Sequence, residues 1–333
     1  MRLSALLLAG IVAATAACSA VAETVPPIGS TPDPGLQLDA GKKPAAKRPA
    51  RVFSKMDTLD EELAKLPQPD DAHPYFNLNL NVGSTDETAE RLVFDITVNR
   101  LPAGKTEFEL KRLEKYGKAN PVPVFAASMT TRANRAMSLM YDVRDRNSSI
   151  FDAKGGFSRV FSMDRKEGNS KVAERITFNY EKDAISALYE RPRSSSDGES
   201  VMVGSTIQMT GKAVDPLAAI YFMRSNAINL KNLIPGKTTA AITLPICSDR
   251  HVWNTRLYAV GVDHLDLGSY KNSECIIFEV DAPFRGLFEH VGKTRVWFHV
   301  ATGVVVKMTA EIPIGPAEAV LNIDESKNSP LNK

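Results

Sequence analysis

The sequence predicts a mainly β protein: a large curved antiparallel sheet, a half-barrel or open barrel, with one helix packed on its concave face. Alternating apolar and polar residues, typical of half-buried strands, recur over residues 92–323. Hairpin-length links separate these runs and favour antiparallel pairing. The one strong helix signal, residues 215–224, interrupts them. Because an open sheet of about a dozen strands must curl or close, we expect the helix on the concave side.

The helix signal has a clear start and almost no polar face. Asp215 can accept a backbone N–H as N-cap, and Pro216 fits the first helical position, where no donor is needed. Residues 217–223 are all apolar. A helix with so little polar surface must be buried.

The start of the chain predicts export. Met1-Arg2 supplies a positive charge, residues 3–17 are an apolar stretch too short to span a bilayer comfortably, and Ala20-Val21-Ala22 is a small-residue cleavage site. We therefore expect residues 1–22 to be a signal peptide and the mature protein to be periplasmic. No later run approaches about 18 apolar residues, so we expect no membrane-spanning segment in the mature protein.

The same export signal allows lipidation as an alternative. Ala16-Ala17-Cys18 resembles the end of a bacterial lipoprotein signal, which would leave Cys18 lipidated and the protein anchored to the outer membrane. Thr15 stands where such signals usually have a bulky aliphatic residue. Contact with the membrane is expected only if Cys18 carries lipid.

The rest of the chain divides into three regions. Residues 23–74 are a Pro-rich and then basic linker with a short helix signal at 59–66. This linker is either a solvated spacer or a tether to anionic lipid or cell-wall polymer. Residues 75–325 should form the curved sheet domain, and residues 326–333 a disordered tail.

Within the sheet domain, strands are expected where polarity alternates, and turns where polar residues or glycines cluster. Expected turns are residues 101–104, 145–147, 154–156 and 263–266, and residues 191–200 should be a mobile loop. The expected strands are residues 92–98, 107–111, 137–143, 157–163, 172–180, 242–246, 252–262, 275–280, 295–300, 304–312 and 317–323.

Two cysteines remain after cleavage of the signal peptide. Cys247 and Cys275 form an even count in an oxidising compartment, which favours a disulfide. Cys247 ends one expected strand and Cys275 begins the next but one, so a plain meander would place them at opposite ends of the sheet. Two buried thiols are therefore the alternative.

Several motifs recur in a recognisable order across residues 92–323. They are Leu101-Pro102-Ala103-Gly104, Met140-Tyr141-Asp142-Val143-Arg144-Asp145, the helix at 215–224, Arg295-Val296-Trp297 and Ile312-Pro313-Ile314-Gly315. This set resembles the bacterial exported proteins grouped as domain-of-unknown-function family 3108. The resemblance implies a curved half-barrel sheet crossed by a helix, similar in outline to periplasmic lipoprotein carriers, and no established activity. Where that family usually has an acidic turn followed by arginine and proline, this chain has Ala301-Thr302-Gly303 and then valines.

The sequence carries few signs of catalysis. It has no Gly-x-Ser-x-Gly elbow, no phosphate-binding glycine loop and no histidine pair at metal-ligand spacing on a helix. His264, in Asp263-His264-Leu265-Asp266, is the best catalytic candidate, with a hydrated polar turn as the alternative. His251 and His299 could ligate zinc if their strands pair, but no third ligand is evident. We expect no enzyme activity, no cofactor and no metal.

The charge balance also excludes one class of partner. The formal net charge of +2 comes from 41 basic and 39 acidic side chains. Such a balance creates no field that would favour nucleic acid.

Candidate ligand-binding residues gather around the expected helix. Methionine and aromatic side chains suit loosely specified apolar ligands, although they can equally form the core. Arg224, at the end of the buried helix, can cap the last carbonyls and pair with Asp142 or Asp145, either as a structural pair or as a ligand clamp. The remaining candidates are Met140, Tyr141, Tyr221, Phe222 and Trp297.

These features support two hypotheses for function. In the first, a non-catalytic envelope protein holds an apolar or amphipathic ligand, such as a lipid, or a partner segment in its curved sheet and supports envelope integrity. In the second, a scaffold binds another envelope protein or cell-wall polymer through its outer face and basic linker. A hydrolase built on His264 is a third hypothesis.

Overall fold

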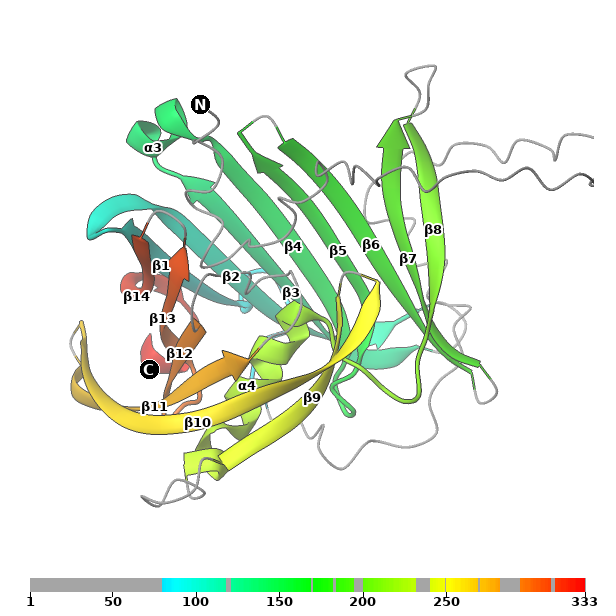
Figure 1. The fold of residues 1–333 in the computed structure, drawn as a ribbon. Helices are drawn as coiled ribbons and strands as arrows, with labels where there is room; N and C mark the ends of the chain where they lie inside the picture. Colours follow the sequence, from blue (N-terminus) through cyan, green and yellow to red (C-terminus); the bar gives the residue numbers. More distant parts are fainter. Residues whose placement is uncertain are drawn as a thin grey trace, which may run out of the picture.

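The structure is a computed structural model in which one sheet of 14 antiparallel strands curls around a helix (Figure 1). It describes residues 80–117, 121–168, 170–181, 184–194, 200–231, 240–248, 250–268, 270–281, 294–312 and 315–332. The expected signal peptide, the lipidation candidate Cys18 and the linker through residue 74 lie outside the described residues. The predicted fold class, a large curved antiparallel sheet with a helix on its concave face, is confirmed.

The first eight strands form a meander in which each strand pairs with the next. A short helix, α3 (Arg135–Met140), connects the third strand to the fourth. The strands are β1 (Glu90–Val98), β2 (Leu101–Tyr116), β3 (Val122–Ala133), β4 (Val143–Asp152), β5 (Ser158–Glu167), β6 (Ser170–Glu181), β7 (Ala184–Ser194) and β8 (Ser200–Gln208).

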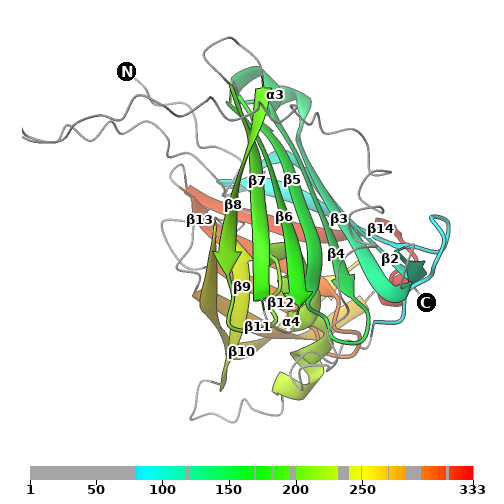
Figure 2. The ribbon, with the colours of Figure 1, turned by 90° about the vertical axis from the view of Figure 1, so that its right-hand side faces the viewer.

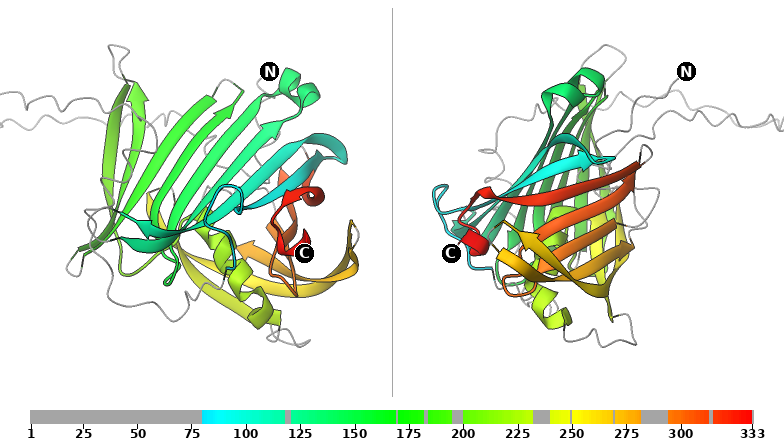
Figure 3. Two further views of the ribbon diagram at one scale, coloured as in Figure 1. Left: turned by 180° about the vertical axis from the view of Figure 1, so that it is seen from behind. Right: turned by 90° about the vertical axis from the view of Figure 1, so that its left-hand side faces the viewer.

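The last six strands form a second meander that meets the first. β14 pairs with β1, so the sheet order runs from β8 down to β1 and then from β14 down to β9. The first and last strands therefore lie side by side within the sheet, and β8 and β9 stand at its two ends (Figures 2 and 3). These strands are β9 (Ala240–Ser248), β10 (His251–Leu267), β11 (Tyr270–Asp281), β12 (Thr294–His299), β13 (Val305–Ile312) and β14 (Gly315–Lys327).

Helix α4 (Pro216–Lys231) connects the two ends of the sheet and crosses the concave side, where it contacts β3, β4 and β9 (Figure 1). Just before the helix, Val214 forms a parallel bridge to Ile246 of β9. The amide of Val214 donates to the carbonyl of Pro245 (3.0 Å), and the amide of Cys247 donates to the carbonyl of Val214 (2.8 Å). The start of the helix is thereby tied to one end of the sheet.

Asp215 caps α4, as its sequence position predicts. Its carboxylate accepts hydrogen bonds from the backbone amides of Leu217 and Ala218, both at 2.9 Å, which satisfies two of the unpaired donors of the first turn. The hydroxyls of Ser149 on β4 (2.5 Å) and Ser158 on β5 (2.6 Å) donate to the same side chain. Asp215 is fully buried, and burial raises the pKa of its carboxyl. One side chain thus caps the helix and fixes it to two strands.

The core lies between α4 and the inner face of the sheet. Leu217, Ile220 and Tyr221 are 0%, 6% and 3% exposed, so the expected burial of the helix is confirmed. Tyr221 stacks on Phe151 of β4, with ring centroids 5.7 Å apart. Because side chains alternate between faces along a strand, the contacts of Ser149 and Phe151 with the helix define the odd-numbered residues of β4 as its inner face.

Three expected strands and turns are wrong in an informative way. Residues 137–140 belong to α3 rather than to a strand, because the Asn134 side chain accepts from the Met137 amide (2.8 Å) and caps a helical turn. Residues 145–147 lie inside β4, and residues 263–266 lie inside β10. Polarity at those positions reflects their place in the sheet rather than a turn.

Other boundaries also shift. The turn after β1 falls at Asn99 and Arg100, with φ of 50° and 67°, so residues 101–104 are already part of β2. The expected loop at 191–200 is shorter, since β7 continues to Ser194 and β8 begins at Ser200. The expected disorder of 326–333 is wrong for the described residues, because a 3-10 turn, Pro330–Asn332, buries Leu331.

Candidate functional site

The inner face of β3–β5 carries a group of polar side chains where a sheet of this kind would ordinarily place apolar ones. We call it the inner polar wall, and it consists of Thr131, Asp145, Asn147, Arg165 and Glu167. The sheet register brings them together: Asp145 lies opposite Thr131 on one side and Arg165 on the other. All five are buried, with Asp145 and Asn147 each 1% exposed.

One end of the inner polar wall is an ion pair beside a tyrosine. The Nε atom of Arg165 lies 3.6 Å from Oε1 of Glu167. Tyr141, directly after α3, donates its hydroxyl to Oε2 of Glu167 at 3.4 Å. Burial, reinforced by the negative charge of Glu167, raises the pKa of the Tyr141 hydroxyl, which therefore remains a donor.

Asp145 is the least satisfied member of the wall. Neither of its carboxylate oxygens makes a hydrogen bond of ordinary geometry with a described residue, although the backbone N–H of Lys166 lies close enough to lower its pKa. Burial raises the pKa of Asp145 to about 8, with a further rise from the charge of Glu167 and an opposing effect of Arg165. A buried carboxyl in this state is a common feature of functional sites, although structural networks can produce it as well.

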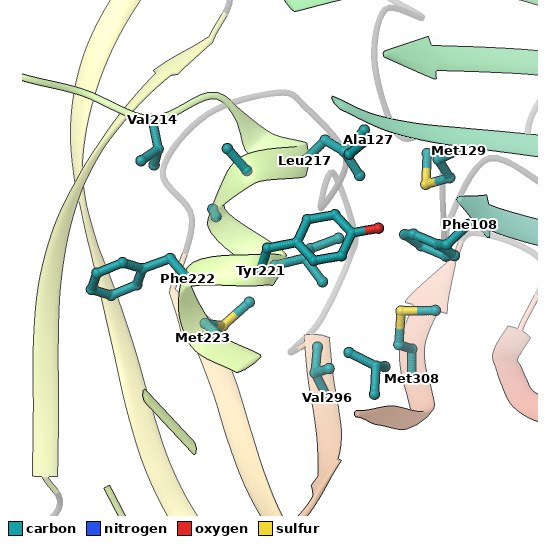
Figure 4. Close-up of a cluster of buried hydrophobic side chains, with 14 of the residues drawn as sticks. Phe108, Ala127, Met129, Val214, Leu217, Tyr221, Phe222, Met223, Val296 and Met308 are labelled. Atoms are coloured by element: carbon teal, nitrogen blue, oxygen red, sulfur yellow. The ribbon is translucent and has the colours of Figure 1, made fainter. Parts of the chain in front are cut away.

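Further buried polar atoms in the same region make no hydrogen bond within the described part of the chain, and two of them lie next to the apolar core. They are Oδ1 of Asn147 on β4 and the hydroxyl of Tyr221 on α4. Figure 4 shows the Tyr221 ring pointing its hydroxyl towards Phe108 and Met129. Since Met129 is the register neighbour of Asn147, polar and apolar groups meet where the wall adjoins the core.

The predicted ligand-binding residues do not line one groove. Tyr221 and Phe222 are buried in the core at 3% and 2% exposure, and Figure 4 shows Phe222 directed away from Tyr221, on the side of Val214. Tyr141 joins the inner polar wall through Glu167. Met140 is the last residue of α3.

Trp297 lies on the opposite face of the sheet from α4. Its indole N–H donates to Oδ2 of Asp263 at 3.0 Å, and the Lys307 ammonium stands 5.3 Å from its ring centroid. Its neighbours in the strand, Val296 and Phe298, take the inner positions and are 1% and 0% exposed. The placement of Trp297 under the helix is therefore wrong, because strand alternation turns it outward.

Arg224 pairs with a residue that the sequence pattern did not suggest. Its guanidinium binds Glu90 of β1 through two hydrogen bonds, Nη1 to Oε1 and Nη2 to Oε2, the latter at 2.8 Å. The expected partner Asp142 instead binds Lys166 (2.8 Å) and Arg144 (3.3 Å). Glu90 and Arg224 are 2% and 5% exposed, so this pair is a structural contact between the helix and the sheet.

The expected disulfide is not formed. Cys247 on β9 and Cys275 on β11 are both free and buried, as in the alternative, and β10 separates their strands. Cys247 pairs with Val252, whereas Cys275 lies between Asp263 and His299 in the ladder. Burial raises the pKa of each thiol to about 12.

The three candidate histidines lie apart from one another in the described part of the chain. His251 on β10 and His299 on β12 are separated by β11, so their strands do not pair. His264 is exposed within β10, opposite Glu274. Across the described ranges, no group of three histidine, cysteine, aspartate or glutamate side chains is placed to hold a metal ion.

A cleft of about 1430 Å³ lies over β1–β4, and its lining residues include Thr131 and Asp145 of the inner polar wall. Register and alternation assign most of its other charged side chains to the outer face, opposite α4. Both signs of charge and several hydroxyls are present, and an outer-face pair, Arg91 with Glu107, adjoins it at 2.5 Å. Outer-face members include Asp95, Lys105, Glu109, Ser128, Thr130, Arg132, Arg144, Arg146 and Asp164.

Fold and site define a class: a half-open antiparallel barrel with a helix in its hollow and buried polar groups on its inner wall. A family model described as "Protein of unknown function (DUF3108)" matches residues 93–322, and the chain belongs to this family. The resemblance stated from the sequence motifs is thereby confirmed.

Comparison with solved structures finds a beta-barrel-like protein of domain of unknown function DUF1849 from Brucella abortus. It shares 13% identity at a TM-score of 0.42, over 73% of this chain and 98% of that one. No curated protein matches the sequence. In the described part of the chain, no helix combines the length and apolar character needed to cross a bilayer.

Proposed function

We propose that this is an exported, non-catalytic protein of the cell envelope, which holds an apolar or amphipathic ligand or partner segment inside its curved sheet and supports envelope integrity. The observation that carries the proposal is the set of buried, unpartnered polar atoms on Asp145, Asn147 and Tyr221, beside the apolar side chains of Phe108 and Met129. A site of this composition suits a ligand with one polar end.

The energetics favour an occupant. A buried polar group without a partner costs about 1–3 kcal/mol. Three such side chains, two on the inner polar wall and one on α4, are therefore a substantial liability in a marginally stable fold. A ligand that brings donors to Asp145 and Asn147 removes part of this cost. The inner polar wall therefore lowers the stability of the unliganded protein and favours ligand binding.

The test is ligand recovery and probe binding with the full chain. Native mass spectrometry and organic extraction of protein purified without detergent should recover an amphipathic molecule. The neutral probe N-phenyl-1-naphthylamine should bind saturably, and Asn147→Leu, which removes an inner polar atom, should weaken binding. Ser148→Leu, a half-buried neighbour with the opposite orientation on β4, is the matched control. An empty protein with no saturable probe binding would contradict the proposal.

A second candidate function is favoured by the outer cleft over β1–β4. Its mixture of acidic, basic and hydroxyl side chains suits a polar partner, either an envelope protein or cell-wall polymer. Co-sedimentation with purified cell-wall polymer tests this candidate. The double variant Arg132→Glu with Arg146→Glu and a deletion of residues 23–51 should each reduce sedimentation. Probe binding inside the sheet should remain unchanged by both.

A further inference from the structure

A row of basic side chains crosses the outer face of the sheet near α3. Each member lies directly opposite the next on the neighbouring strand, from β2 to β6. Like charges placed directly opposite one another destabilise a sheet, so an anionic partner would relieve an unfavourable arrangement. We call this group the basic row, and it consists of Lys105, Arg132, Arg144, Lys166 and Lys171.

Acids neutralise only part of the basic row. Asp142 is shared between Arg144, at 3.3 Å, and Lys166, at 2.8 Å. Arg132 and Lys171 are exposed, and neither forms a salt bridge with a described residue. The carboxylates that pair with members of the row are Asp95, Asp142 and Glu325. The basic row therefore keeps an excess of positive charge.

Two strongly exposed leucines lie beside the basic row. Leu101, directly after the β1–β2 turn, is 69% exposed, and Leu139 of α3 is 86% exposed. The turn and the helix are adjacent, because the Asn134 side chain at the start of α3 donates to the carbonyl of Pro102 at 2.7 Å. Figures 1 and 2 show α3 at the end of β3 and β4 that lies away from α4. Both leucines thus stand at the same end of the sheet, which we call the α3 end.

Each of these leucines has an exposed arginine next to it. Arg100 directly precedes Leu101 in the turn. Arg135 lies four residues before Leu139, which places both side chains on one face of α3. Met137 packs against the core instead, so it holds the helix on the sheet while Leu139 stays exposed. Apolar side chains beside cations are typical of surfaces that insert among anionic lipid headgroups.

We propose that the α3 end binds an anionic lipid membrane surface, with Leu101 and Leu139 inserted among the headgroups and the basic row close to their phosphates. The sequence predicts membrane contact only through a lipidated Cys18, whereas this contact belongs to the folded domain. It goes beyond the proposed function and does not require a ligand inside the sheet.

A soluble partner fits the α3 end less well. A soluble polyanion or an acidic protein would also be attracted to the basic row. A polyanion in water, however, gains nothing from exposed leucines, and an acidic protein would need a matching apolar pocket for each of them. A lipid surface accommodates both leucines and supplies many negative charges at once.

The experiment measures co-sedimentation of the full chain with lipid vesicles. All proteins carry Cys18→Ser, so that a lipid anchor does not contribute. Vesicles of phosphatidylcholine alone are compared with vesicles that also contain phosphatidylglycerol. The protein should bind the anionic vesicles at least about tenfold more tightly than the neutral ones, and added salt should weaken this binding.

A charge variant and its matched control test the place of contact. Arg135→Glu with Lys171→Glu should weaken binding to the anionic vesicles by at least about tenfold. Lys115→Glu with Lys154→Glu makes the same charge change at exposed residues of the other end of the strands, and it should weaken binding far less.

A second pair of variants tests insertion of the apolar side chains. Leu101→Ser with Leu139→Ser should weaken binding by about tenfold. Val260→Ser with Val262→Ser, at two exposed valines of β10, should leave binding unchanged.

Each contrary outcome would overturn the proposal for a stated reason. Equal binding of neutral and anionic vesicles, or none, would exclude an anionic lipid surface, a result that needs no variant to fold. Equal losses in the two charge variants would indicate non-specific attraction. A loss in the Arg135 and Lys171 variant without a loss in the leucine variant would identify a site for a soluble polyanion. Binding that is lost on deletion of residues 23–51 but kept by both α3-end variants would identify the linker as the contact.

Discussion

The buried pair of Arg224 and Glu90 offers the sharpest test of how α4 is held. Both side chains are almost fully buried, at 5% and 2% exposure, and two parallel hydrogen bonds join them. Arg224→Met removes the cation and leaves the Glu90 carboxylate buried without a counter-charge. Breaking a buried pair in this way costs about 3–5 kcal/mol. For a domain of this size, we expect the Tm to fall by about 2–4 °C per kcal/mol.

The double variant separates attraction from desolvation. Replacing both members, Arg224→Met with Glu90→Leu, removes the buried charge entirely, and such exchanges are often neutral or stabilising. Urea unfolding followed by far-UV circular dichroism gives the three free energies of a double-mutant cycle. We expect the double variant to be more stable than Arg224→Met by several kcal/mol. A single variant that loses less than about 1 kcal/mol, or two losses that simply add, would refute the reasoning.

Three further predictions follow from individual residues. The pKa of Asp145 is raised from 3.8 in the unfolded chain to about 8 in the folded protein. Between these pH values the folded protein keeps a proton that the unfolded chain has lost. The free energy of unfolding should therefore fall as pH rises from about 4 to about 8. Asp145→Asn should make the free energy of unfolding less dependent on pH, and above about pH 8 it should be more stable than wild type by about 1 kcal/mol or more. Urea titrations at several pH values measure this, and the same pH dependence in both proteins would contradict it. Gly303 has φ of +69°, and an added Cβ would lie 2.6 Å from the Arg224 carbonyl oxygen, so Gly303→Ala should cost more than about 1 kcal/mol in chemical denaturation. Gly211, where a Cβ meets nothing within 4 Å, is the control, and an equal loss in both variants would count against the stated cause. Cys247 and Cys275 are free and buried. They should therefore resist iodoacetamide in the native protein, and both should react with it in urea without reductant. A Cys247–Cys275 disulfide found by peptide mass spectrometry would disprove this.

The sequence could predict the features that local chemistry encodes. Asp215 and Pro216 predict the start of α4, and the alternating runs predict the strands, because helix capping and strand alternation depend on residues close together in the sequence. The turn at residues 154–156 was also predictable, since Asp152 accepts from the backbone amides of Lys154 (3.0 Å) and Gly155 (2.6 Å).

The inner polar wall could not be predicted from such local rules. The polar run of residues 145–147 favours a turn, because polar residues in a row are more common in turns than on the buried face of a strand. The one available signal is their spacing: Val143, Asp145, Asn147 and Ser149 alternate with Arg144, Arg146 and Ser148, so both faces are polar and neither reveals burial. The partner of Arg224 was missed for a related reason, since Glu90 lies 134 residues away and only the sheet order brings β1 to the helix.

The proposed function requires a route by which a ligand reaches the inner polar wall, and the two polar anchors of α4 limit that route. Asp215 fixes the start of the helix to β4 and β5, and Arg224 fixes its second half to β1. Lifting the helix would expose or orphan both buried groups, at a cost of several kcal/mol. Asp145, by contrast, lies near the beginning of β4, five residues after α3 ends. Entry past the α3 end of the strands leaves both anchors intact, so variants in α3 should change ligand exchange more than variants in α4 of equal stability.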